Sequence, residues 1–142
     1  MILLDAYALV ALLAGEAAGA EVEQLLRDGQ TGVTSVNLAE AIERTRRVHE
    51  VPHAKVRHAL EALLGPVILV LAPAEREAWR AADLRARYYD RSARAVSIAD
   101  CFLLAAAGSG DSIATSDPAV AATARDEAIE VVALPDSAGR RP

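Results

Sequence analysis

Short apolar runs alternate along the chain with longer segments of helical periodicity. The runs are rich in aliphatic or β-branched residues and predict five buried strands, at Ile2–Leu4, Thr31–Val36, Val67–Leu71, Ser112–Thr115 and Glu130–Leu134. Between them, the spacing of apolar residues predicts helices over Ala6–Leu13, Ala20–Arg27, Asn37–His49, Pro52–Leu64, Pro73–Tyr88, Ser97–Ala107 and Pro118–Glu127. Residues 89–96 are expected to form a loop.

Strands that are separated by helices throughout predict right-handed crossovers and a parallel sheet with helices on both faces. The expected fold is therefore α/β, a three-layer α/β/α domain with a five-stranded parallel sheet. A chain of 142 residues with 53% hydrophobic content is long enough to bury the core of one domain. We expect a single domain over residues 1–142, with about 135–142 as a frayed tail.

Composition narrows the class of protein. Asp5 interrupts the apolar N-terminal run before any basic residue, which argues against a signal peptide, and no apolar run reaches the roughly 20 residues of a membrane span. The single cysteine, Cys101, has apolar neighbours and is expected to be a buried filler in a reducing compartment. These features predict a soluble, cytoplasmic protein. The net charge of −5 argues mildly against a surface that binds nucleic acid throughout.

Acidic residues lie where the predicted strands end or the next helices begin. Asp5 follows the first strand, Glu40 lies one turn into the helix after the second, Asp100 is near the start of an apolar helix, and Asp117 follows the fourth strand. Parallel α/β sheets bind ligands at the carboxyl ends of their strands. If the first and fourth strands are neighbours, Asp5 and Asp117 face each other at this edge.

Each acid also has a purely structural interpretation. Asn37-x-x-Glu40 and Ser97-x-x-Asp100 fit capping boxes, while Asp5 and Asp117 fit helix N-caps. Four carboxylates at one edge would, however, raise one another's pKa, and a fold that gathers them normally holds a cation. An all-oxygen ligand set suits Mg²⁺ or Mn²⁺.

These residues carry a family resemblance over nearly the whole chain. Asp5 before AYALVALL, Glu40 in NLAE, Asp100 in SIADCFLLAAA and Asp117 in TSDPAV resemble the acidic motifs of PIN-domain ribonucleases, and the chain length resembles that of VapC toxins. Thr115 matches a hydroxyl that commonly supports the site in this family. Tyr7 and Pro118 depart from the family pattern, which often has Ser or Thr at the position of Tyr7.

The resemblance implies a Rossmann-like PIN fold and a metal-dependent ribonuclease that hydrolyses RNA phosphodiesters. Asp5, Glu40, Asp100 and Asp117 would be the catalytic and metal-coordinating residues, with Glu40 either a ligand or the group that activates the attacking water. Divalent ions suit this reaction because they neutralise the phosphodiester charge and lower the pKa of water. The resemblance further implies a cognate antitoxin as partner and a homodimer. The resemblance does not fix whether one or two ions bind.

Basic residues supply candidate RNA contacts. The loop region RARYYDRSAR at 85–94 combines two tyrosines with the arginines Arg85, Arg87, Arg91 and Arg94, which could hold an unpaired RNA strand by charge and stacking. A second basic set could contact phosphates or form an ordinary wet helix face, and it comprises Arg44, Arg46, Arg47, Lys55 and Arg57. Trp79 is expected in the core or at an interface.

Two other functions fit parts of the pattern. A catalytically silent PIN-fold module that binds a protein would keep the acids only as caps. An aspartyl-phosphate phosphatase would also place an acid after the first strand, but its second acid would fall on Tyr7, and Lys55 is the only lysine in the chain. Metal binding separates the ribonuclease from the silent module.

Overall fold

The computed structural model describes residues 1–142 and confirms the predicted α/β fold. Its elements follow the order β1 (Ile2–Leu4), α1 (Ala6–Ala14), α2 (Gly19–Asp28), β2 (Thr31–Thr34), α3 (Ser35–Val48), α4 (His53–Glu61), β3 (Ile68–Leu71), α5 (Glu75–Tyr88), α6 (Ile98–Ala106), β4 (Ser112–Thr115), α7 (Pro118–Asp126) and β5 (Glu130–Ala133). The strands form one parallel sheet in the order β3-β2-β1-β4-β5. None of the helices combines the length and apolarity that crossing a membrane requires.

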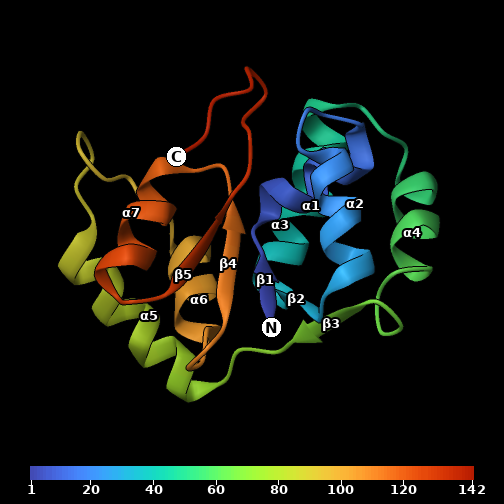
Figure 1. Cartoon of the computed structure of the whole chain (residues 1–142). Helices are drawn as coiled ribbons and strands as arrows, with labels where there is room; N and C mark the ends of the chain where they lie inside the picture. The colour runs from blue at the N-terminus through green and yellow to red at the C-terminus, as the bar shows by residue number, and fades with distance from the viewer.

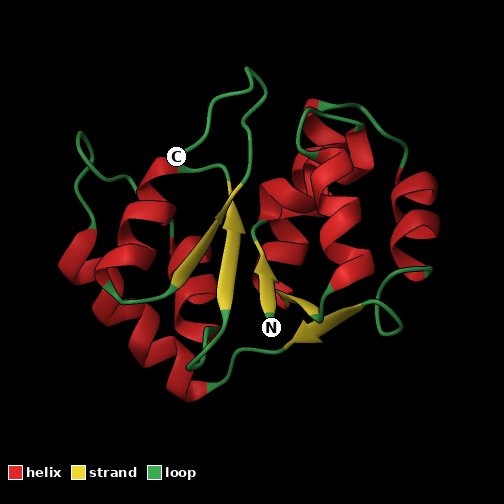
Figure 2. Ribbon diagram, viewed as in Figure 1, coloured by secondary structure: helices red, strands yellow, loops and turns green.

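The sheet is the middle of three layers (Figures 1 and 2). Helices α1–α4 lie on one side of it and α5–α7 on the other. Leu3 of β1 and Ile113 of β4 point into the core under α5–α7, whereas Leu4 and Ala114 point into the core under α1–α4. Since β1 and β4 are neighbours whose following helices leave to opposite faces, the sheet has its switch point between them.

The start of α3 differs from the prediction. The strand expected over Thr31–Val36 ends at Thr34, because the Thr34 hydroxyl accepts a hydrogen bond from the Asn37 backbone N–H and so caps a helix that begins at Ser35. The expected capping box between Asn37 and Glu40 is therefore wrong. Asn37 lies inside the helix, and its side-chain oxygen accepts a hydrogen bond from Thr34 instead.

Two apolar predictions also change. The edge strand β3 leaves Leu69 and Val70 exposed, 49% and 39% respectively, so helices do not cover the whole sheet on both faces. Trp79 on α5 is 68% exposed, and its indole N–H donates to Glu75, so it does not lie in the core; its place at an interface stays a prediction. Cys101 is buried, as predicted.

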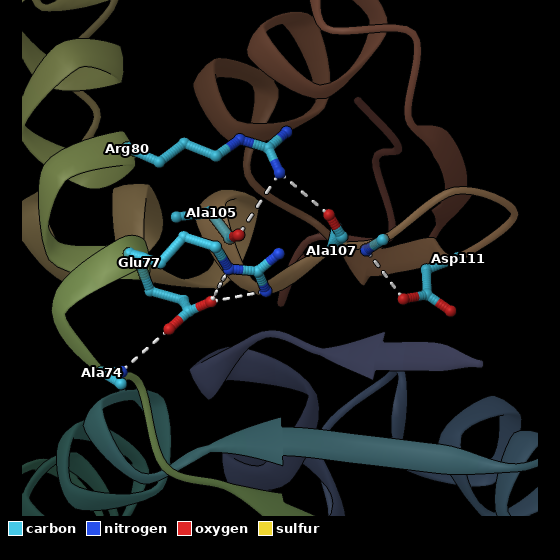
Figure 3. A network of polar contacts seen from close by, with 8 residues as sticks. Ala74, Glu77, Arg80, Ala105, Ala107 and Asp111 are labelled. Carbon is cyan, nitrogen blue, oxygen red and sulfur yellow. Dashed lines mark hydrogen bonds and ion pairs between the residues drawn. The ribbon is translucent and has the colours of Figure 1, made fainter.

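Polar contacts at the amino-terminal edge of the sheet join α5 to the end of α6 (Figure 3). Arg80 of α5 donates to the carbonyl oxygens of Ala105 and Ala107, at 3.3 and 3.0 Å. A cation at these terminal carbonyls is favourable because it offsets the negative end of the helix dipole. The contacts fix α6 at the end opposite Asp100, which lies in its first turn.

Candidate active site

The predicted acids meet in one pocket at the carboxyl edge of the sheet. Asp5 follows β1, Glu40 is on α3, Asp100 is on α6 and Asp117 follows β4, and all of them line a cavity of about 410 Å³. Four separate elements thus deliver one carboxylate each to the switch point of the sheet. Their metal-binding and catalytic roles remain predictions at this stage.

Asp5 is the most enclosed of these acids, with 5% of its surface exposed. Its Oδ1 accepts a hydrogen bond of 2.6 Å from the Ala6 backbone N–H, which makes Asp5 the N-cap of α1 as predicted. Its Oδ2 accepts a hydrogen bond of 2.6 Å from the Thr115 hydroxyl at the end of β4. The same hydroxyl oxygen accepts from the Asp117 backbone N–H at 3.0 Å. Thr115 therefore connects Asp5 to the segment that carries Asp117.

Burial and negative neighbours perturb Asp5. Loss of hydration is the main cause that raises its pKa to about 7, and the charge of Asp100 adds to the effect. The hydrogen bond from Thr115 acts in the opposite direction, because it stabilises the ionised form. An aspartate with a pKa near neutrality in a polar pocket is typical of a functional site.

Asp100 and Asp117 are both turned towards helix starts. Asp100 completes the predicted capping box, its Oδ2 accepting from the Ser97 backbone N–H at 2.6 Å while Ser97 caps the Asp100 N–H. Asp117 caps α7 and accepts from the N–H groups of Ala119 and Val120. Burial still raises the pKa of Asp100, and the nearby charge of Asp117 contributes. The favourable cap contacts therefore do not offset the cost of ionising Asp100 in this pocket.

Glu40 has the least satisfied carboxylate. Its Oε2 is buried and has no hydrogen-bond partner. Burial raises the pKa of Glu40, and the charge of Asp100 raises it further. A buried carboxylate oxygen without a donor is costly, and a bound ligand would remove that cost.

The donor set fits a divalent cation, although the carboxylates do not yet surround one. No three acidic, histidine or cysteine side chains lie close enough together to hold a metal ion. Asp100 Oδ1, Asp117 Oδ2 and Glu40 Oε2 nonetheless accept no hydrogen bond. These oxygens suit Mg²⁺ or Mn²⁺. A cation would relieve the repulsion that adds to burial in raising the pKa of Asp5, Glu40 and Asp100. Binding requires the carboxylates to draw closer than they lie here.

The pocket also contains residues that were not predicted for it. Arg44 lies one turn beyond Glu40 on α3, and Asp136 and Ser137 come from the expected frayed tail. Asp136 follows the end of β5, so the strand-end rule that selected Asp5 and Asp117 could have found it. The spacing of four residues from Glu40 could likewise have placed Arg44 on the same helix face. Tyr7, noted only as a departure from the family pattern, lines the pocket too.

The predicted RNA-contacting arginines do not line this pocket. Arg85 donates to the Val96 carbonyl and stacks 4.0 Å from the centre of the Tyr89 ring. Arg87 pairs with Glu127 and Arg94 with Asp126, each at 2.6 Å. Arg91 is exposed and makes no ion pair within the chain. Contacts of these arginines with RNA stay a prediction, and three of the side chains are already engaged within the protein.

Solved structures share this fold at low sequence identity. A toxin–antitoxin complex from Klebsiella pneumoniae matches with a TM-score of 0.63 and 19% identity, over 86% of this chain and 91% of that one. FitAcB from Neisseria gonorrhoeae matches with a TM-score of 0.62 and 20% identity, over 92% and 96% of the two chains. VapBC2 from Rickettsia felis, bound to a DNA fragment from its promoter, matches with a TM-score of 0.65 and 13% identity, over 93% and 98%.

The curated proteins contain no significant sequence match. The sequence model of one family, the PIN domain, matches residues 2–133, which include every strand, every helix and the four acids of the pocket. The chain therefore belongs to the PIN domain family.

Proposed function

We propose that the protein is a metal-dependent ribonuclease that hydrolyses RNA phosphodiesters, with Mg²⁺ or Mn²⁺ held by Asp5, Glu40, Asp100 and Asp117. One observation carries the proposal: these carboxylates come from separate elements and line one pocket, where burial, and after it the charge of a neighbouring acid, raises the pKa of Asp5, Glu40 and Asp100. Helix capping alone does not require them to converge. Membership of the PIN domain family supports the same assignment.

The cation would neutralise charge on the phosphodiester and make water a better nucleophile at neutral pH. Asp5 supplies a carboxylate held in place from both sides, by the Ala6 N–H and the Thr115 hydroxyl. Asp100 and Asp117 each keep one oxygen free of hydrogen bonds. Glu40, with its unpartnered Oε2, supplies either a further ligand or the acceptor for a proton of the attacking water.

The proposed biological role is that of the toxin in a toxin–antitoxin pair. Two of the similar structures are described as a toxin–antitoxin complex and as VapBC2. An apolar groove of about 460 Å³ lies between α1, α2 and α4, and is lined mainly by Leu12, Leu13, Leu26, Ala59, Leu63 and Val67. A groove of this kind suits the apolar face of an amphipathic helix. We propose that a cognate antitoxin occupies it.

Asp100→Asn tests whether Asp100 is only a cap. The amide keeps the size of the side chain and an oxygen that can accept from Ser97, but it removes the charge. Because ionisation of Asp100 is disfavoured in the fold, the metal-free variant should be as stable as the wild type or more stable. It should lose most of the rise in melting temperature that Mn²⁺ produces, since a ligand stabilises the state that binds it.

The silent protein-binding module predicts the opposite pattern. There, Asp100→Asn would lower the free energy of unfolding by roughly 0.3–1 kcal/mol, through the weaker interaction with the helix dipole, and Mn²⁺ would have the same effect on both proteins. Thermal melts of the two proteins with and without Mn²⁺ therefore decide between the functions.

A further inference from the structure

The acidic pocket has a single basic side chain in its lining. Carboxylates from Asp5, Glu40, Asp100, Asp117 and Asp136 face it, and Arg44 is the only lysine or arginine among the lining residues. A nucleic-acid strand carries a negative charge at each phosphate. A lining of this composition therefore repels RNA, the substrate in the proposed function. A cation at the rim would reduce that repulsion.

Arg44 is placed on α3 so that it shares a face with Glu40. The two residues are four apart, which brings side chains together on one side of a helix. The two charges also interact, because the positive charge of Arg44 partly opposes the rise in the pKa of Glu40. Arg44 therefore lies next to the proposed reaction centre and not on a remote surface.

The guanidinium of Arg44 is not committed to another group. On the same helix, Arg47 pairs with Glu43, but Arg44 takes part in none of the ion pairs or side-chain hydrogen bonds of the chain. Asp136, the acid that enters the pocket from the tail, is itself paired with Arg140 at 2.9 Å. Arg44 is also exposed, so its donors are available to a ligand at the pocket mouth.

The other arginines near the pocket differ in this respect. Arg85 is held by the Val96 carbonyl and the Tyr89 ring, while Arg87 and Arg94 pair with acids of α7 and the residue that follows it. Recruiting any of them to RNA would cost an existing contact. Among these arginines, only Arg44 both lines the pocket and has a guanidinium without a partner in the chain.

We propose that Arg44 binds a phosphate of the RNA strand at the mouth of the acidic pocket. The planar guanidinium matches two phosphate oxygens at once, which an ammonium group cannot do. This inference rests on the proposed function and assigns Arg44 to substrate binding, separate from the carboxylates that hold the cation. Arg44 thereby offsets the repulsion that the acids exert on the substrate.

The test compares Arg44→Ala and Arg44→Lys with Arg47→Ala, a matched control on the same helix that removes an arginine paired with Glu43. Fluorescence anisotropy with a labelled single-stranded RNA, without divalent metal, measures binding apart from cleavage. Arg44→Ala should weaken binding about tenfold and reduce the slope of log affinity against log salt by about 0.7, the contribution of one phosphate contact on a single strand. Arg44→Lys should keep the salt slope and lose part of the affinity.

Steady-state cleavage in Mn²⁺ gives the second readout. Arg44→Ala should raise KM about tenfold, leave kcat within about twofold, and keep the rise in melting temperature with Mn²⁺. The inference is overturned if Arg44→Ala binds RNA as tightly as Arg47→Ala. It is equally overturned if Arg44→Ala loses the Mn²⁺ stabilisation, because Arg44 would then organise the carboxylates. A wild type that binds RNA but does not cleave it in Mn²⁺ contradicts the ribonuclease proposal alone, whereas a wild type that neither binds RNA without metal nor cleaves it in Mn²⁺ contradicts both.

Discussion

At the scale of one residue, Asp5 shows the free-energy cost of ionising a carboxylate in this pocket. Its carboxylate is buried at the junction of β1 and α1, within range of the charges of Asp100 and Asp117. Two hydrogen bonds, from Ala6 and Thr115, fix its orientation without restoring the ordinary pKa. The position of Asp5 therefore costs stability, a cost that functional sites often carry.

The cost of ionising Asp5 should appear in the pH dependence of the free energy of unfolding. Unfolded Asp5 loses its proton near pH 3.8 and folded Asp5 near pH 7, so the unfolded state binds fewer protons between these values. The free energy of unfolding of the metal-free protein should therefore fall as the pH rises through this window, by up to about 4 kcal/mol from this group. Glu40 and Asp100 act in the same direction. Urea unfolding at a series of pH values measures the effect.

Asp5→Asn is the matching variant, because it removes the titrating group and keeps its size. The variant should show a flatter pH profile and should be more stable than the wild type at pH 7 without metal. Thr115→Val provides the converse control: it removes the hydrogen bond that favours ionised Asp5, so the wild-type slope should persist and extend to higher pH. Equal slopes for Asp5→Asn and the wild type would contradict the assigned pKa.

At this scale the sequence predicted the acids but not their surroundings. Asp5 and Asp117 were found because a strand end is visible as the end of an apolar run. Asp136 obeys the same rule after β5, but its polar and glycine-containing context indicated a frayed tail. The sequence groups Arg44 with Arg46 and Arg47 in a basic set that could contact phosphates or form a wet helix face, because it does not show which of the three lies near Glu40. Side-chain direction depends on packing between α1 and α3, which no local pattern records.

Helix α3 positions two of the pocket residues, Glu40 and Arg44, and its N-cap is Thr34. The Thr34 hydroxyl caps the helix and also donates to the buried Asn37 side chain. Thr34→Ala removes both contacts and should lower the free energy of unfolding by about 0.5–2 kcal/mol. Thr34→Ser, which keeps the hydroxyl, should recover most of this loss. Chemical denaturation of the three proteins tests the prediction, and an Ala variant as stable as the wild type would contradict the cap.

The elements themselves were largely predictable, and their errors have local causes. The strand Ser112–Thr115 was predicted with its observed ends, because Asp111 and Asp117 bound it clearly. The end of β2 was misplaced because Val36 continues the apolar pattern beyond Thr34, although the threonine already caps the next helix. A cap of this kind depends on backbone geometry, and a threonine fits equally well in a strand.

At the scale of the whole molecule, the topology separates two surfaces. The switch point between β1 and β4 gathers the acids at the carboxyl edge, while the apolar groove lies on the side of α1, α2 and α4. Exposed apolar side chains such as Leu69, Val70 and Trp79 add surface that remains open in the monomer. This distribution agrees with association through apolar surfaces and chemistry at the acidic edge.

We expect the purified protein to be a homodimer. Burial of exposed apolar side chains supplies the driving force for association. Light scattering coupled to gel filtration at micromolar concentration should give twice the mass of the 14.9 kDa chain. A mass of one chain across the accessible concentrations would show that the open apolar surface serves another partner.

Cleavage of single-stranded RNA by the purified protein during a titration with Mn²⁺ tests the central claim most directly. Wild-type protein should cleave only when metal is present and stop when a chelator is added. Asp5→Asn and Asp100→Asn, shown to be folded by their thermal melts, should lose at least about hundredfold in rate, since removal of even an outer contact of a metal site costs 10–100-fold. Cleavage that persists without metal, or at the wild-type rate in both folded variants, would contradict the account.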